Sequence, residues 1–342
     1  MIKRFVVAVS SAACLLALSL NNGGGATADP LSVRAPVHAT LAEFARTRTR
    51  PSNERFVPRA WFSQAALTLR GRSAVPYALY VSAIEPSGAG VVDIFAAGRS
   101  GAHPPLIGQV TGLNSPSNIA IDLHGTLYVC QTNAGAPVLL FPLGAKTPSL
   151  ALQTLGNLPV AVAVSPAGTV FVSTANANGL SAKILVYAPG KTLPAKQFSS
   201  LAGDAVGALQ TDEHGNVYFA GDFMGAGNYI GEVSTAGAGR SLLKLSAPAT
   251  GLELDRAGNL LAQTSALGIY AHESGQLLRT LSEGGAQSIS FDVSEGSIYT
   301  ATGTIRQYAY PSGALLQTIT TLAADETFGI ATSPPAPHGR SW

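Results

Sequence analysis

The chain has little cysteine and little charge for its length. It contains 2 Cys in 342 residues, and charged residues make up 12% of it, about half the usual share. Cys14 lies in an N-terminal apolar run, which leaves Cys130 alone, so we expect no intramolecular disulfide and a buried Cys130. Low charge with 46% hydrophobic residues excludes intrinsic disorder.

The two signs of charge nearly cancel. Without Lys3 and Arg4 the 21 basic residues become 19, equal to the 19 acidic ones. A neutral chain lacks the positive footprint that nucleic acid requires, so we expect no nucleic-acid partner. Residues 29–75 nevertheless contain 8 Arg and 3 acidic residues, and we expect this basic arm to pack on the more acidic remainder.

Apolar runs long enough to span a membrane are missing from the sequence. The longest, residues 5–20, is 16 residues, below the ~18 that a spanning helix needs. It follows Lys3 and Arg4 and precedes Ala26-Thr27-Ala28, which fits a small-residue cleavage site. The pattern predicts a signal peptide at residues 1–28, export to the periplasm or the extracellular space, and no membrane span.

A hairpin pattern repeats through the rest of the chain. Each copy has an apolar strand, a turn that opens with Asp or Ser and ends with Gly, and a second apolar strand. The Asp or Ser side chain caps the turn, and Gly supplies the positive φ. The clear copies are residues 118–129, 161–172, 208–219 and 251–262, and a looser copy is 288–300.

Each hairpin is followed by two more short strands, the first of which mostly ends in an aromatic residue. Anchor residues of the second strands recur every 38 to 48 residues: Leu79, Leu127, Val170, Val217, Leu260 and Ile298. Four strands per repeat at this spacing predict an all-β, six-bladed β-propeller of four-stranded antiparallel blades. A parallel solenoid would have a shorter period.

The chain end supplies a strand that the first repeat lacks. Residues 328–333 match the innermost-strand pattern and stop at Pro334-Pro335. We therefore expect the C-terminal strand to complete the first blade and close the ring, which removes an exposed sheet edge. The predicted domains are the signal peptide, an arm at 29–75 in which residues 40–43 form a capping box that opens a short helix, the propeller at 76–333 and a disordered tail at 334–342.

Several of these motifs resemble the NHL-repeat family of bacterial β-propellers. They are residues 115–122 with 125–129, and residues 184–190. Trp61-Phe62 ahead of 79–82, together with 310–313, is similar to exported, largely uncharacterised propellers of soil bacteria. The resemblance covers roughly residues 58–333 and implies the fold but no function, because one fold hosts many functions.

The same superfold includes gluconolactonase-type lactonases, and this distant similarity implies a divalent cation held by Glu, Asn and Asp on the central axis. The expected counterparts lie four residues before each turn. Asn118 is the one good metal ligand among them, and they include no carboxylate, so we expect neither a metal nor another cofactor. The set is Asn118, Ala161, Ala208, Gly251, Ser288 and Gly329.

Other chemical motifs are weak. Glu253 and Asp255 share one face of a strand, as an acid pair would, but the repeat assigns Asp255 to a turn. Asp212-Glu213-His214 also falls on a turn. The six His residues show no zinc-ligand spacing, and neither a Gly-x-Ser-x-Gly elbow nor a phosphate-binding Gly-rich loop occurs. No catalytic residue is identified.

The candidate binding residues lie mainly in loops between second and third strands, which gather on one face of a propeller. We expect an unknown small molecule, glycan or protein to bind there, and a monomeric chain. The function favoured is an exported binding or scaffold module. The alternative is a propeller hydrolase, lactonase or lyase with a central-channel site. The candidates are Asn118, Asn133, Asn176, Asn178, Asp222, Phe223 and Tyr229.

Overall fold

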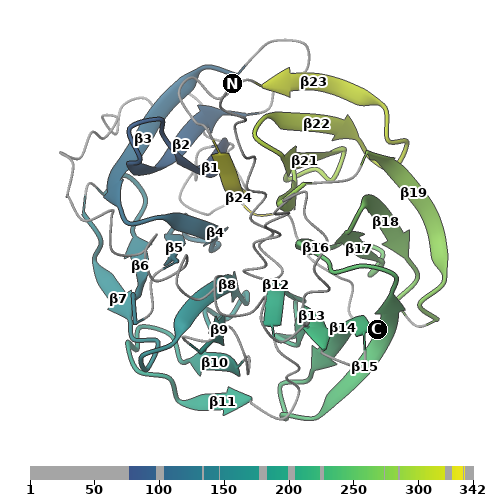
Figure 1. Ribbon diagram of the computed structural model, residues 1–342, viewed down its shortest axis with the longest axis horizontal. Coiled ribbons are helices and arrows are strands. Elements are labelled where there is room, and N and C mark those ends of the chain that lie inside the picture. Colours follow the sequence, from purple (N-terminus) through teal and green to yellow (C-terminus); the bar gives the residue numbers. More distant parts are fainter. Residues whose placement is uncertain are drawn as a thin grey trace, which may run out of the picture.

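The computed structural model describes residues 77–97, 104–132, 135–145, 147–176, 183–198, 205–223, 227–272, 274–283, 286–319, 326–333 and 335. These residues form 24 strands in six four-stranded sheets, set as blades around a central axis (Figure 1). The predicted six-bladed propeller is therefore confirmed. The predicted signal peptide, the arm with its short helix and, apart from Pro335, the tail lie outside the described residues. Within the described ranges no helix has the length and apolar character of a membrane span.

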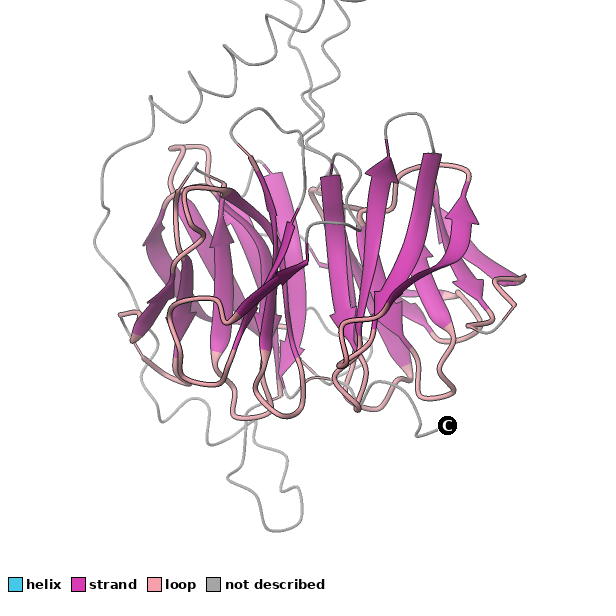
Figure 2. Ribbon diagram, turned by 90° about the horizontal axis from the view of Figure 1, so that it is seen from below, coloured by secondary structure: helices cyan, strands magenta, loops and turns pink. Residues whose placement is uncertain are grey.

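Each blade runs outward from the axis in four antiparallel strands, and the strands lie roughly along the axis (Figure 2). The innermost strands are β24 (Glu326–Ser333), β4 (Pro116–Ile121), β8 (Leu158–Val164), β12 (Ala205–Thr211), β16 (Gly251–Leu254) and β20 (Ser288–Phe291) for blades one to six in order. The second strands are β1 (Ala78–Ile84), β5 (Leu127–Gln131), β9 (Val170–Ala175), β13 (Val217–Phe223), β17 (Leu260–Gln263) and β21 (Ser297–Ala301).

The outer half of each blade follows the same order. The third strands are β2 (Gly90–Ala96), β6 (Val138–Phe141), β10 (Lys183–Tyr187), β14 (Gly227–Val233), β18 (Ala266–Tyr270) and β22 (Ile305–Ala309). The outermost strands are β3 (Leu106–Leu113), β7 (Leu150–Leu152), β11 (Lys196–Phe198), β15 (Gly239–Leu245), β19 (Leu277–Glu283) and β23 (Leu315–Ile319).

The ring is closed by strands from opposite ends of the propeller sequence. β24 pairs antiparallel with β1, from Ala78 opposite Ser333 to Ile84 opposite Glu326. Figure 1 shows the yellow β24 beside the blue β1. This pairing gives blade one its innermost strand, as the sequence predicts, and covers the backbone edge that β1 would otherwise expose.

The hairpin turns have the geometry that the repeat predicts. Gly125, Gly168, Gly215 and Gly258 have φ between 80° and 85°. In the first of these turns, Asp122 Oδ1 accepts hydrogen bonds from the backbone N–H groups of His124 and Thr126 at 2.9 and 2.8 Å. A carboxylate at the turn start thus satisfies two backbone donors, which is why the pattern needs Asp or Ser there.

The turn of blade six departs from the pattern. Glu295 occupies the position of Gly with φ 56°, a conformation that non-Gly residues adopt at a cost. Its Oε2 accepts a hydrogen bond from Arg256 N at 2.9 Å, and its Oε1 lies 3.8 Å from Arg256 Nε. Arg256 lies in the turn of blade five. The contacts of Glu295 with Arg256 therefore link blades five and six at the turn where Glu295 replaces Gly.

The apolar core lies between the blades. Six buried clusters each combine side chains of two neighbouring blades, such as Leu79 of blade one with Tyr299 of blade six. Cys130 is fully buried in the cluster between blades two and three, as predicted, and burial raises the pKa of its thiol. The apolar core is therefore divided among the six interfaces between neighbouring blades.

Two second-strand serines connect innermost strands of adjacent blades. Ser173 Oγ accepts a hydrogen bond from Ala161 N at 3.0 Å and donates one to the Val206 carbonyl at 2.9 Å. Ser82, at the same position of blade one, accepts from Gly329 N and donates to the Ser117 carbonyl. Buried polar groups are thereby paired, and the channel wall is held blade to blade.

We predict that the chain truncated after Asp325 loses cooperative stability. It lacks β24, which buries Phe328 and Ile330, each contributing about 1.5–3 kcal/mol. Its melting temperature should fall by roughly 10 °C or more, since 1 kcal/mol shifts a domain of this size by about 2–4 °C. Truncation after Pro335 keeps β24 and is the control. Equal melting temperatures for the two truncated chains, measured by circular dichroism, would contradict ring closure by β24.

Candidate functional site

A pocket occupies the central channel. Its volume is about 340 Å³, and residues of the innermost strands of all six blades line it. Asn118 lies toward the end where the loops between second and third strands emerge, because β4 begins there. Leu123, Pro166 and Glu213, in the hairpin turns, and Pro335 line the opposite end. The pocket therefore follows the axis between the two faces of the ring.

Strand alternation sorts the lining into tiers. The first tier holds the residues four before each turn. The structure places Asn118, Ala208, Gly251 and Ser288 of this set on the pocket wall, as the repeat predicts, but the other two, Ala161 and Gly329, are not among the lining residues. Asn118 Oδ1 accepts a hydrogen bond from Val162 N at 2.9 Å. This amide ties blade two to blade three, so its oxygen is engaged in the wall itself.

A second tier lies two residues further along each strand, at positions that the repeat alone does not single out. Three neighbouring blades, four to six, supply its polar members, and blades one to three supply alanine. All six residues line the pocket: Gln210, Glu253, Ser290, Ala331, Ala120 and Ala163. The expectation that no carboxylate lines the channel is wrong, because side chains two apart on a strand share a face.

Glu253 is the chemically distinctive residue of this tier. Gln210 Nε2 donates a hydrogen bond to Glu253 Oε2 at 2.6 Å, and Gln210 Oε1 accepts one from Thr211 N at 2.8 Å. Both polar atoms of the Gln210 amide are thus hydrogen-bonded, and this amide positions the Glu253 carboxyl group. Burial raises the pKa of Glu253 to about 8, against the opposing hydrogen bonds from Gln210 and the backbone. At neutral pH the group is mainly a neutral carboxylic acid.

Asp255 does not form an acid pair with Glu253. Its Oδ1 accepts a hydrogen bond from Asn259 N at 2.7 Å, and its Oδ2 accepts bonds from Asn259 Nδ2 at 2.8 Å and from Tyr310 Oη at 2.6 Å. It is absent from the pocket lining. Asp255 is therefore a turn residue, as the repeat predicts, and Glu253 is the member of the proposed pair that lines the pocket.

The predicted loop residues are only partly described. Asn133 and Asn178 lie outside the described residues. Asp222 and Phe223 belong to β13, but their side chains are not described. Their role stays a prediction.

Asn176 and Tyr229, the other two predicted loop residues, are described. The Tyr229 ring lies 6.2 Å from that of Phe219, and burial raises the pKa of Tyr229 to about 12. Neither residue lines the central pocket, so the structure does not bring them together with Glu253. Their predicted role in binding is untested.

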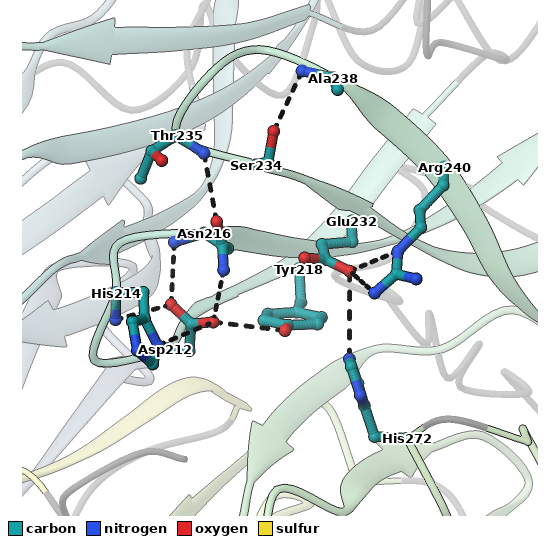
Figure 3. Close-up of polar contacts among 10 residues, drawn as sticks. All are labelled: Asp212, His214, Asn216, Tyr218, Glu232, Ser234, Thr235, Ala238, Arg240 and His272. Carbon is teal, nitrogen blue, oxygen red and sulfur yellow. Dashed lines mark hydrogen bonds and ion pairs between the residues drawn. The ribbon is translucent and has the colours of Figure 1, made fainter. Parts of the chain in front are cut away.

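A second polar cluster lies in blade four and at its contact with blade five (Figure 3), and none of the residues drawn there is among those that line the pocket. Asp212 caps its turn by accepting hydrogen bonds from His214 N and Asn216 N at 3.0 and 2.9 Å. The predicted turn role of the Asp212-Glu213-His214 sequence is thus confirmed. Tyr218 Oη donates to Asp212 Oδ2 at 3.4 Å, which joins the turn to the second strand.

Glu232 forms the other half of this cluster. Its Oε2 accepts a hydrogen bond from Arg240 Nε at 2.8 Å and lies 2.7 Å from Arg240 Nη2. His272 of blade five places Nε2 4.0 Å from the same oxygen, and its ring lies 5.5 Å from that of Tyr218. These contacts join two blades, and we interpret the cluster as structural. In the described part of the chain no group of three His, Cys, Asp or Glu residues could hold a metal ion.

Comparisons with known proteins support the fold. Neither protein-family models nor curated proteins match the sequence. A chain of the nidogen/laminin complex, a β-propeller, is similar with a TM-score of 0.61 and 13% identity, over 76% of this chain and 99% of that one. Hydrazine synthase of Kuenenia stuttgartiensis gives a TM-score of 0.46 and 16% identity, over 64% of this chain and 68% of that one. The first similarity shows the propeller fold alone, and the second is too weak to add to it.

We predict that Glu253 makes the stability of the protein fall between about pH 4.5 and pH 8. In this window the unfolded chain has released a proton that folded Glu253 keeps, so raising the pH favours unfolding. Relative to Glu253→Gln, the free energy of unfolding should fall by up to about 1.4 kcal/mol per pH unit and level off above pH 8.

Urea unfolding of both proteins across this range measures the difference. Asp93→Asn is the matched control, because Asp93 is another buried carboxyl bonded to an amide, Gln109 Nε2 at 2.8 Å, and lies outside the pocket. That variant should keep the fall up to pH 8. Parallel curves for wild type and Glu253→Gln would contradict a neutral Glu253.

We predict that Arg240→Met destabilises the protein by about 1–2 kcal/mol, because it leaves the buried Glu232 carboxylate without its cation. The double variant Glu232→Gln/Arg240→Met should recover part of this loss, since no buried charge remains. Lys244→Met, exposed on the same strand β15, is the control and should change stability little. Chemical unfolding of the four proteins tests this, and equal values for Arg240→Met and Lys244→Met would contradict it.

Proposed function

We propose that this protein is an exported binding module that holds a small organic molecule in its central pocket. The observation that carries the proposal is the second tier of the wall. Blades one to three have alanine there, so the fold itself needs no polar side chain at this level. Gln210, Glu253 and Ser290 in the other three blades are therefore best explained by what the pocket contains.

The size and lining of the pocket suit such a ligand. Small-molecule sites enclose about 300–1,000 Å³ and combine apolar walls with a few placed polar groups. This pocket has about 340 Å³. Its apolar half comprises the tier alanines with Ile119 and Val162, and its polar half comprises the Gln210–Glu253 pair and Ser290. A ligand with one polar end and one apolar end would match both halves.

Export and family are parts of the same proposal. The N-terminal pattern from Lys3 to Ala28 supports a signal peptide and a location in the periplasm or outside the cell. The repeated hairpin, with its capped turns, supports an NHL-repeat-like origin. The loop face with Asn176 and Tyr229 would then surround the Asn118 end of the channel, opposite the mouth at the hairpin turns.

Two other functions are compatible with a propeller fold, a protein scaffold and an enzyme. A scaffold for protein partners would use the outer faces; the similar propeller in the nidogen/laminin complex comes from a protein–protein assembly, but the likeness is one of fold. A hydrolase or lyase would use Glu253 as an acid or base. Asp255 caps a turn, so it does not supply the second carboxyl group of such a site.

We predict that filling the pocket abolishes small-molecule binding. Ala120→Phe places an aromatic ring against the apolar half of the wall, whereas Ala236→Phe lies in an exposed turn and is the matched control. Fragments that bind wild type in ligand-observed NMR should bind Ala236→Phe equally and lose at least about tenfold in affinity for Ala120→Phe.

Leu123→Trp, at the exposed end of the pocket, is a second blocking variant in case Ala120→Phe melts at a lower temperature. Fragments that bind all four proteins alike, or a library from which nothing binds wild type, would contradict the proposed function. Catalytic turnover of any bound fragment would favour the enzyme alternative.

A further inference from the structure

The described residues of the pocket wall carry charge of one sign. Among these residues three have carboxyl side chains, Asp122, Glu213 and Glu253, and none is Lys, Arg or His. Asp122 is engaged in its turn, where Oδ2 also accepts a hydrogen bond from Tyr128 Oη at 3.1 Å. Glu213 is exposed at the mouth. Glu253 is the acid that lies deep in the channel, with 5% of its surface exposed.

We propose, on the basis of the central-pocket function above, that the ligand is an organic cation, an amine whose ammonium group pairs with Glu253 and whose apolar body lies against the alanines of blades one to three. The two mouth acids would attract a cation and repel an anion at the entrance. Gln210 holds the Glu253 carboxyl in place, so little side-chain freedom is lost when the ion pair forms.

The opposite half of the wall defines the body of the ligand. Ala120, Ala163 and Ala331 lie on the innermost strands of blades one to three, which form the half of the ring opposite blades four to six. Small side chains leave room there, and Ile119 and Val162 add apolar surface. A single aromatic ring or a short alkyl chain attached to the amine fills such a space, and a second charged group would be desolvated without compensation.

Binding an ammonium ion has a defined proton balance. The amine enters as the cation, and Glu253 passes from the carboxylic acid to the carboxylate and gives its proton to solvent. No covalent bond forms or breaks apart from this O–H bond. Since the pKa of Glu253 in the empty pocket is about 8, binding at pH 6.5 should release close to one proton, and binding at pH 9 almost none.

The same balance fixes how affinity depends on pH. Below pH 8 each unit of pH should increase the affinity for an amine about tenfold, because less work is needed to ionise Glu253. Above pH 8 the affinity should level off until the amine itself loses its proton near pH 10. A neutral ligand would show no such rise, since it leaves Glu253 protonated.

Matched probes test the proposal. Isothermal titration calorimetry compares 2-phenylethylamine and hexylamine with the corresponding alcohols, 2-phenylethanol and hexanol, and with 3-phenylpropanoate. Titrations in two buffers of different ionisation enthalpy give the protons released. We expect the amines to bind at least about tenfold more tightly than the alcohols at pH 8, with proton release at pH 6.5, and the anion to bind most weakly.

Variants separate the charge from the cavity. Glu253→Gln keeps the shape of the side chain, so it should abolish the amine preference and the proton release while alcohol binding remains. Asp93→Asn removes a buried carboxyl outside the pocket and should leave both unchanged. The wild-type proton count needs no variant and holds even if Glu253→Gln unfolds.

The outcomes distinguish the two proposals. If alcohols bind as tightly as amines, or amine binding releases no proton at pH 6.5, the cation inference is overturned while the binding pocket stands. If no amine in this set binds but neutral or anionic fragments lose affinity in Ala120→Phe, the inference is likewise overturned. If no fragment of any charge depends on the pocket, the proposed function itself fails.

Discussion

The backbone ladder between β24 and β1 is the interaction on which the rest of the structure depends. It joins residues separated by almost the whole propeller sequence, from Ala78 opposite Ser333 to Ile84 opposite Glu326. Closing so long a loop has an entropic cost, and the ladder and the clusters flanking blade one offset it. Because all six interfaces must close in the same ring, each innermost strand can pair with its second strand in only one register. The channel wall is a consequence of that register.

Register explains why a repeat can determine chemistry at the axis. Side chains alternate along each innermost strand, so the positions four and two residues before the turn face the pocket. Second-strand serines such as Ser82 and Ser173 fix neighbouring strands relative to one another. A slip of one residue would exchange the two faces of an innermost strand and break those bonds. The positions of the residues in both tiers are therefore set by the closed ring.

The sequence predicts the blades well because their signals are local. A turn opening with Asp122 and closing with Gly125 specifies its own geometry, and the spacing of anchors counts the blades. Glu295 shows the limit, since a Glu with positive φ depends on Arg256 of another blade, which no local pattern reveals. The wall was half predicted. The repeat places Asn118 on the wall, but the positions four residues before each turn form only the tier nearest the loops, and Glu253 belongs to the next tier.

A buried carboxyl in the wall works against the stability of the fold that positions it. Alanine at the same tier in blades one to three shows that the propeller closes without polar groups at this depth. Because the pKa of Glu253 is about 8 in the folded protein, the empty protein loses stability as the pH rises toward this value. A bound cation would restore that stability, because it makes the ionised form of Glu253 favourable. Functional sites commonly carry such a cost. The group that weakens the empty ring is then the one that a bound ammonium ion would make stabilising, which couples occupancy of the channel to the stability of all six blades.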